Sequence, residues 1–150
     1  ATIFFSDIVS GPDQGGENGD GAFVTLYGNG FGTEQGLSTV TVGDSPASAY
    51  PIWSQGKIAL QVPQGAASGD IVVHTADGDS NGVPFAVRPG RILCVAVDGD
   101  DSADGSIGSC WGTLGYATDS AQPGDIIYAM NGVEAREEHR YSATLSIESS

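Results

Sequence analysis

An acidic stretch in the second half of the chain holds the clearest candidate ligands for a metal ion: Asp98, Asp100, Asp101 and Asp104. Calcium prefers hard oxygen ligands, so closely spaced carboxylates favour such a cation. The stretch departs from an EF-hand loop, because Ser102 and Ala103 stand where that loop has a ligand and its glycine. Aspartate also forms ordinary exposed turns. The sequence therefore leaves a calcium loop and a solvated turn as alternatives. A weaker acidic set is Asp13, Glu17 and Asp20.

Two aromatic residues, Tyr50 and Trp53, are the candidates for contact with carbohydrate. Together they could offer a flat aromatic face to a sugar ring. A half-buried aromatic residue on a strand is also common in protein cores, where its polar end reaches the surface. Sugar binding and core packing both remain open for this pair, whereas Trp111 is expected to pack.

The chain contains serine, histidine and acidic residues, but their order and spacing match no known motif of nucleophilic catalysis. The chain has no Gly-x-Ser-x-Gly sequence, and its two histidines, His74 and His139, are far apart along it. The 19 acidic residues would form chance pairs in any fold, so their number does not indicate glycoside hydrolysis. We therefore predict no catalytic residue in this chain.

The composition indicates that short strands position these residues. Of 150 residues, 23 are glycine and 7 are proline, which is too many for a helical bundle. Hydrophobic residues make up 39% and charged residues 16%, so the chain can form a core. The net charge of −14 repels phosphate backbones and anionic lipids. We expect no nucleic-acid partner and, without an apolar run of about 18 residues, no membrane insertion.

The first part of the chain shows the period-two alternation of half-buried strands. Strands are expected over 22–27, 57–62, 70–75 and 83–87, between turns rich in glycine, asparagine and aspartate. Such a series predicts an immunoglobulin-like β-sandwich, whose two sheets share one core. The expected core residues are Val24, Leu26, Ile58, Leu60, Ile71, Val73, Phe85 and Val87.

A longer set of motifs in the same part resembles the IPT/TIG family of immunoglobulin-like domains. The strand from Ala22 runs into Gly28-Asn29-Gly30-Phe31-Gly32, and Thr39-Val40-Thr41-Val42-Gly43 follows. The stretches 53–63 and 69–85 resemble the second half of that family. The resemblance covers residues 1–88 and implies a β-sandwich. The acidic stretch 11–20 is longer than the usual entry loop of the family.

After a linker at 88–91, the chain resembles the entrance of right-handed parallel β-helix proteins of the pectate-lyase type. The motifs lie at 97–101, 111–114 and 121–128. The residue pattern predicts strands at 92–97, 125–129 and 143–147 and a short helix at 113–121, in which Leu114, Ala117 and Ala121 form one narrow apolar face. The resemblance implies that this helix caps the open end of the β-helix. Residues 89–150 would then form the N-terminal cap and first coil of a truncated β-helix. The expected fold class is mostly β: a sandwich at 1–88, then the start of a parallel β-helix with a short capping α-helix.

The chain has two cysteines, which can form one disulfide at most. We predict a bond between Cys94 and Cys110, which would join the first strand of the coil to the loop before the capping helix. Two buried free thiols are the alternative, since unpaired cysteine is itself often buried.

Three functions fit these observations. The first is a non-catalytic N-terminal accessory region of a polysaccharide-acting β-helix protein, a lyase or a hydrolase, whose remaining coils would be a partner of this region. The second is a carbohydrate-binding module in its own right, and the third is a structural, adhesin-like surface domain. Polysaccharide is the candidate ligand and calcium the candidate cofactor. The acidic, lysine-poor composition favours a secreted or cell-surface protein of a bacterium.

Overall fold

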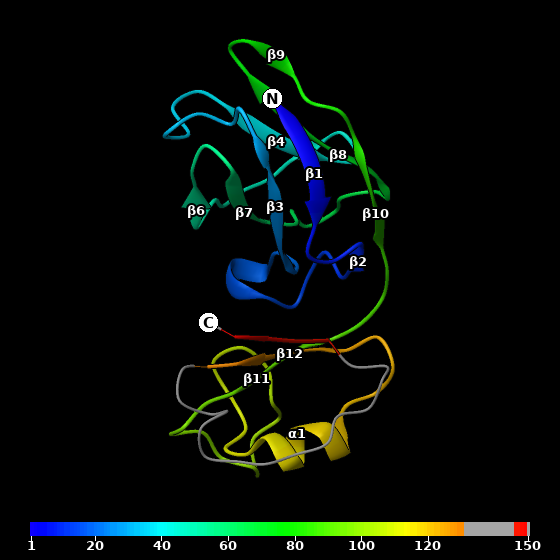
Figure 1. Cartoon of the computed structure of the whole chain (residues 1–150). Helices are drawn as coiled ribbons and strands as arrows, with labels where there is room; N and C mark the ends of the chain where they lie inside the picture. The colour runs from blue at the N-terminus through cyan, green and yellow to red at the C-terminus, as the bar shows by residue number, and fades with distance from the viewer. Residues whose placement is uncertain (131–145, 150) are drawn as a thin grey trace. The chain divides into compact units, whose positions relative to one another are not determined.

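The computed structural model describes residues 1–130 and 146–149. The chain forms two compact units (Figure 1). The first contains residues 1–14 and 19–88, and the second contains residues 15–18 and the chain from Pro89 onward. A short 3-10 turn occupies Glu17–Gly19.

The first unit contains two sheets of mainly antiparallel strands. One sheet has the order β1 (Thr2–Ser6), β3 (Phe23–Asn29), β7 (Lys57–Gln61) and β6 (Ile52–Trp53). The other has the order β2 (Ser10–Gly11), β10 (Val83–Val87), β8 (Gly69–Thr75), β4 (Thr39–Val42) and β5 (Ser45–Pro46), and β9 (Gly78–Asp79) also pairs with β8. The strands expected from the alternation are confirmed to within two residues at each end.

The core of this unit forms from the inward residues of both sheets. In β3, Val24 and Leu26 are fully buried, and their partners in β7 are Leu60 and Ile58. The second sheet contributes Ile71, Val73 and Phe85 to the same cluster. Of the predicted core residues only Val87 is partly exposed, and it still packs against the cluster. Period-two alternation was therefore a sufficient guide to this core.

Two glycines of the family motifs have clear steric roles in the first unit. Gly28 lies opposite Ile3 in the β1–β3 ladder, and a Cβ there would collide with the carbonyl oxygen of Thr2. Gly43 and Asp44, with φ of 52° and 71°, form the two-residue turn between β4 and β5. Positive φ at both positions suits the tight turn of a right-twisted hairpin.

β1 is an edge strand, and the side chain of Asn81 caps part of its free edge. The Ile3 N–H donates to Asn81 Oδ1 at 2.8 Å, and Asn81 Nδ2 donates to the Ile3 carbonyl at 3.0 Å. The β1–β3 register shifts between Ile3 and Phe5, which is a β-bulge. Side-chain capping and bulges both discourage an edge strand from pairing with another chain.

The second unit contains a parallel sheet in which consecutive strands are neighbours. β11 (Ile92–Val95) pairs with β12 (Ile126–Ala129), which pairs with β13 (Ser146–Ser149). All four residues of β11 and of β12 are buried, as is typical of parallel sheets covered on both faces. The predicted strand at 143–147 lies partly outside the described residues, as does His139.

Helix α1 (Leu114–Ser120) lies between β11 and β12 in the chain. Thr113 is its N-cap, and the Thr113 hydroxyl accepts a hydrogen bond from the N–H of Tyr116 at 3.3 Å. Leu114 and Ala117 are buried in a cluster with Leu93 and Ile127, and Ala121 packs against it. The predicted helix and its narrow apolar face are thus confirmed.

Candidate functional site

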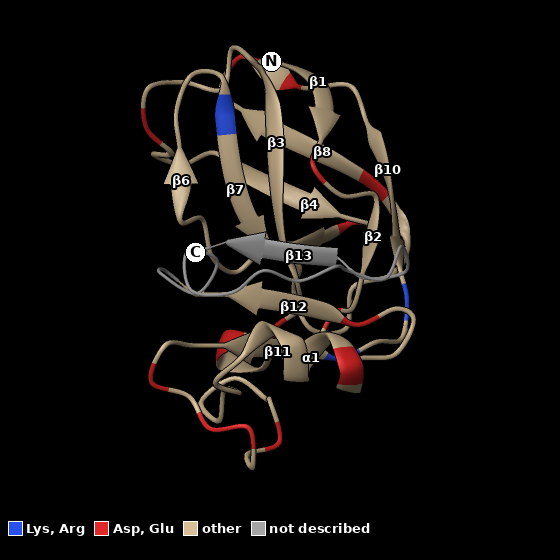
Figure 2. Ribbon diagram, turned by 60° about the horizontal axis from the view of Figure 1, so that its bottom comes forward, with Lys and Arg blue, Asp and Glu red and all other residues tan. Residues whose placement is uncertain are grey.

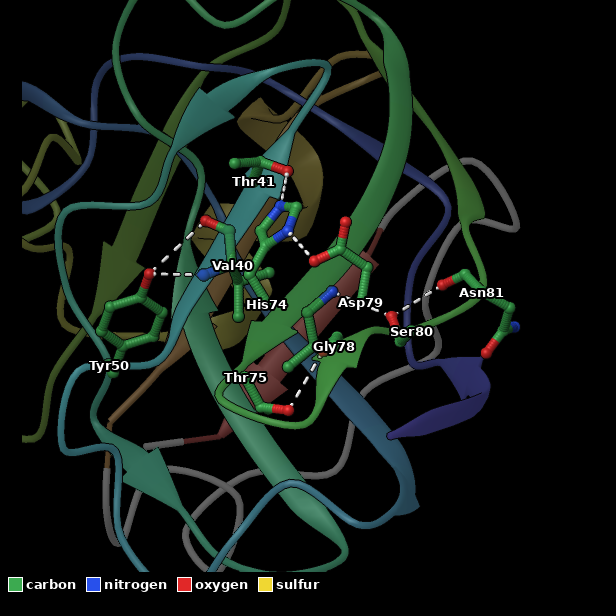
Figure 3. A network of polar contacts seen from close by, with 10 residues as sticks. Val40, Thr41, Tyr50, His74, Thr75, Gly78, Asp79, Ser80 and Asn81 are labelled. Carbon is green, nitrogen blue, oxygen red and sulfur yellow. Dashed lines mark hydrogen bonds and ion pairs between the residues drawn. The ribbon is translucent and has the colours of Figure 1, made fainter.

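A chain of hydrogen bonds links Thr41, His74 and Asp79 on the outer side of the β4–β8–β9 sheet (Figure 3). Thr41 Oγ1 lies 2.9 Å from His74 Nε2, and His74 Nδ1 lies 2.7 Å from Asp79 Oδ1. Thr41 and His74 are on neighbouring strands, and the β8–β9 hairpin brings Asp79 opposite His74. The order hydroxyl, imidazole, carboxylate is that of a catalytic triad.

The surroundings of Thr41 do not provide the rest of a hydrolytic site. Acyl transfer needs N–H donors aimed at a developing oxyanion. β4 pairs with β5 on one side of Thr41 and with β8 on the other, so the nearby backbone amides belong to the sheet ladders. Asp79 is also 65% exposed, so the histidine and its carboxylate lie in water rather than in a closed pocket. The contacts fit a surface network that ties three strands together.

The two predicted sugar-contacting residues, Tyr50 and Trp53, lie next to each other but do not form a flat face. Their rings meet edge to face, with centroids 5.4 Å apart and planes at 80°. Both are partly buried against the sandwich core. Tyr50 Oη accepts a hydrogen bond from the Val40 N–H at 2.8 Å, and burial raises the pKa of the Tyr50 phenol. The indole of Trp53 donates to the Phe31 carbonyl at 3.1 Å. These contacts favour the packing alternative.

Three of the four aspartates of the acidic stretch, Asp100, Asp101 and Asp104, accept hydrogen bonds from separate partners, and Asp98 is exposed. Asp100 accepts from the hydroxyl and N–H of Ser102, and these bonds hold its pKa below the usual value. Asp104 does the same with Ser106, and its pKa is lowered for the same reason.

Asp101 instead accepts hydrogen bonds from the residues just before α1. It accepts from the N–H groups of Gly112 and Thr113 and from the Thr113 hydroxyl, all within 3.0 Å. Within residues 1–130, no three acidic, histidine or cysteine side chains come close enough together to hold a metal ion. The acidic loop, whose aspartates are red in Figure 2, therefore has the contacts of a hydrogen-bonded turn.

The weaker acidic set does not converge on one point either. Asp13 accepts from the Gly65 N–H at 2.8 Å, and Asp20 accepts from the Gln64 N–H at 3.0 Å. The Ser48 hydroxyl also donates to Asp20, and together these bonds lower the pKa of Asp20. Asp13 and Asp20 thus fasten the entry loop to the turn after β7.

Cys94 and Cys110 are joined by a disulfide in the second unit, with their Cα atoms 4.8 Å apart. The bond ties β11 to the segment before α1, where Trp111 forms an isolated parallel bridge with Val95. Trp111 is almost fully buried, and its indole donates to the Ala103 carbonyl at 2.8 Å. The tryptophan thus anchors the acidic loop to the core of the second unit.

A row of side chains that sequence reasoning missed crosses the outer face of the first sheet. Phe5 of β1 lies opposite Tyr27 of β3, and Tyr27 lies opposite Lys57 of β7. The two rings stack with centroids 4.9 Å apart and planes at 21°, and Lys57 Nζ lies 5.7 Å from the centre of the Tyr27 ring. The signal in the sequence was Phe4-Phe5, two large apolar residues in a row before the first alternating strand.

Residues 5–87 match the IPT/TIG domain family, and the chain belongs to it. Comparison with curated proteins gives no match. Among solved structures, the chain is similar to an auxiliary nutrient binding protein from Bacteroides thetaiotaomicron, with 19% identity, a TM-score of 0.47, and coverage of 58% of this chain and 20% of that one. It is also similar to a gamma-CGTase from alkalophilic Bacillus clarkii, with 24% identity, a TM-score of 0.46, and coverage of 66% and 14%. The chain thus corresponds to a small part of each of these structures.

Among the described residues, no helix has the length and apolar character needed to cross a membrane.

Proposed function

We propose that this chain is a non-catalytic accessory region of an exported, polysaccharide-acting protein, in which an IPT/TIG sandwich precedes the cap and first coil of a right-handed parallel β-helix. The observation that carries the proposal is the sheet of the second unit. β11, β12 and β13 pair in parallel and in chain order, and Ile92, Ile126 and Ser146 occupy the same position in the ladder. Stacking of successive strands in register is what the coils of a β-helix produce.

Local contacts of the second unit support the same reading. Parallel neighbours need a long connection, and the one between β11 and β12 contains the acidic loop, the disulfide and α1. The helix packs its apolar face on Leu93 and Ile127, which lie in neighbouring strands. A short helix at the start of a parallel stack is suited to cover the apolar end of the first coil.

The contacts of the described side chains support the proposal that this region is non-catalytic. The triad-like network lacks oxyanion donors around Thr41, and the carboxylates of the acidic loop bind neighbouring hydroxyl and amide groups. Polyuronate lyases need a base next to the acidic proton and a cation to neutralise the substrate carboxylate. Within residues 1–130, no three acidic, histidine or cysteine side chains lie close enough together to hold such a cation as a metal ion.

The test combines binding and turnover on the same samples. The intact chain is incubated with insoluble cellulose, starch granules and xylan, and with polygalacturonate and alginate in the presence of calcium. Sedimentation measures binding, and absorbance of unsaturated products and release of reducing ends measure turnover. We expect binding to at least one polysaccharide and no turnover. Absence of binding to every polysaccharide, or turnover that His74→Ala abolishes, would overturn the proposal.

A further inference from the structure

The row formed by Phe5, Tyr27 and Lys57 is a surface feature of the sandwich and not an extension of its core. Leu26 and Ile58, the chain neighbours of Tyr27 and Lys57, are fully buried on the opposite face of the sheet. Phe5, in contrast, is 56% exposed. Leaving a large aromatic ring in water forgoes the free energy that its burial would provide. Figure 1 shows the two strands that bear the rings, β1 and β3, side by side.

Each member of the row restrains the next. The Phe5 ring stacks on one face of Tyr27, and the ammonium group of Lys57 lies over the Tyr27 ring. Cross-strand aromatic pairs and cation–π contacts of this kind stabilise one arrangement of the side chains. Since Tyr27 covers one face of Phe5 and Phe5 remains more than half exposed, a preorganised aromatic surface is available at β1. Preorganisation reduces the entropy lost on binding.

The charge around the row limits what can bind there. β1 and β3 contain no charged residue, and Lys57 is the only ion of the row. The carboxylate of Asp7, which follows β1, accepts a hydrogen bond from the Thr25 N–H of β3 at 2.8 Å. Figure 2 shows β3 without either charge colour. The chain as a whole has a charge of −14, so polyuronates and nucleic acids are repelled on approach. An uncharged ligand with an apolar face and many hydroxyl groups meets no such barrier.

A second copy of the chain is a less suitable occupant. Two copies would repel each other through their net charge, since each carries −14. Pairing of two β1 edges would also have to displace the side chain of Asn81, which bonds both backbone groups of Ile3. These features favour a neutral ligand over self-association at this face.

We propose that the Phe5–Tyr27–Lys57 row binds an uncharged polysaccharide, with the apolar C–H face of one sugar ring stacked on Phe5. The hydroxyl of Tyr27 and the ammonium group of Lys57 then offer hydrogen bonds to the sugar hydroxyls. The inference rests on the proposed function, because it names the ligand class and the binding surface of the accessory region. It also moves the binding surface away from Tyr50 and Trp53, whose polar atoms already bond to the backbone.

Affinity electrophoresis in native gels containing soluble starch, mixed-linkage β-glucan, galactomannan or polygalacturonate tests this proposal. We expect retardation of the intact chain by at least one neutral polysaccharide. Phe5→Ala should weaken that binding on the order of tenfold, and Lys57→Met by a few-fold. Phe5→Leu keeps an apolar side chain without an aromatic face, and should lose binding as Phe5→Ala does.

A matched control is Tyr116→Ala, which removes an aromatic ring of comparable exposure, 44%, in the second unit. It should leave retardation unchanged, and thermal unfolding should show that all variants remain folded. Equal retardation of the Phe5 variants and the unmodified chain, or binding to polygalacturonate alone, would overturn the inference and leave the proposed function intact. If the intact chain binds no polysaccharide in gels or by sedimentation, both fail.

Discussion

Different kinds of contact stabilise the interior of each of the two units of this chain. In the sandwich, the inward residues of the two sheets form one cluster without a covalent link. In the described part of the second unit, three further contacts add to the apolar cluster. They are the Cys94–Cys110 disulfide, the Arg91–Asp125 ion pair and the hydrogen bonds of Asp101 to the start of α1. The difference indicates that long antiparallel strands suffice to build a core, whereas short parallel strands joined by long loops need local restraints on those loops.

If burial of its own residues stabilises the sandwich, the sandwich should fold alone. We propose a domain boundary at residues 88–91, where β10 ends and β11 has not yet begun. Residues 1–88 expressed alone should unfold cooperatively, because their core cluster draws only on residues of this segment. Calorimetry and circular dichroism check this. A broad, non-cooperative transition for the 1–88 piece would contradict the boundary.

Leu60→Ala should produce the largest effect of any single substitution considered for the sandwich. Leu60 is fully buried opposite Val24, and truncation of a buried leucine costs about 2–5 kcal/mol through lost burial and the resulting cavity. Calorimetry should show a lower melting temperature for the transition of the first unit only. The matched variant Leu114→Ala, at a fully buried position in α1, should lower the transition of the second unit instead. A shift of both transitions by either variant would show that the units unfold together.

Removal of the disulfide should destabilise the second unit by roughly 3 kcal/mol, since it closes a loop between residues 16 positions apart. The double variant Cys94→Ala/Cys110→Ala removes the bond without leaving a free thiol. Chemical denaturation followed by Trp111 and Trp53 fluorescence separates the units, because each contains one tryptophan. Single-tryptophan versions, Trp53→Phe and Trp111→Phe, assign the signals. An equal loss of stability in the first unit would contradict the local role of the disulfide.

Much of the fold could be predicted from local patterns, while the surface sites could not. The strands at 23–29, 57–61 and 69–75 followed from the alternation of residue types along each of them, with Val24, Leu26, Ile58, Leu60, Ile71 and Val73 all buried in the core. β1 was missed because its bulge at Phe4 breaks the period of two, and the exposed Phe5 was missed with it. The Thr41–His74–Asp79 contacts depend on strand pairing between distant segments, which residue spacing does not encode. The acidic loop indicated possible ligands, but the structure pairs its carboxylates with nearby serines and the start of α1.

The ion pair between Arg91 and Asp125 should make the second unit sensitive to acid. Burial of Asp125 raises its pKa, but hydrogen bonds from the Arg91 side chain and from the N–H groups of Gln122 and Arg91, with the charge of Arg91, outweigh burial. The pKa of Asp125 is thus lowered below the ordinary value of 3.8. A carboxyl whose pKa is lower in the folded state stabilises the protein above its unfolded pKa, and this stabilisation disappears as the pH falls through the folded pKa.

Asp125→Asn should therefore destabilise the second unit at neutral pH by about 1–3 kcal/mol, less than a fully buried pair, because the Arg91 side chain is 48% exposed. The stability of the variant should also decrease less than that of the unmodified chain below about pH 4. Denaturation curves between pH 2 and 7 measure both effects. Asp119→Asn, which removes a carboxylate from α1 in the same unit, is the control. An unchanged acid profile in Asp125→Asn would show that other carboxylates determine the acid sensitivity.

The smallest expected effect concerns the Thr41–His74–Asp79 network. His74 and Asp79 lie 2.7 Å apart, but their side chains are 35% and 65% exposed, so water competes for the contact. Exposed pairs contribute about 0–1 kcal/mol, and salt screens them further. A double-mutant cycle with His74→Ala and Asp79→Ala should give a coupling free energy below about 1 kcal/mol that decreases in 1 M salt. A coupling above 2 kcal/mol, insensitive to salt, would mean that this hairpin holds the outer sheet together. The distinction between a sandwich stabilised by burial and a second unit stabilised by local contacts would then no longer hold, because the sandwich too would depend on a polar link.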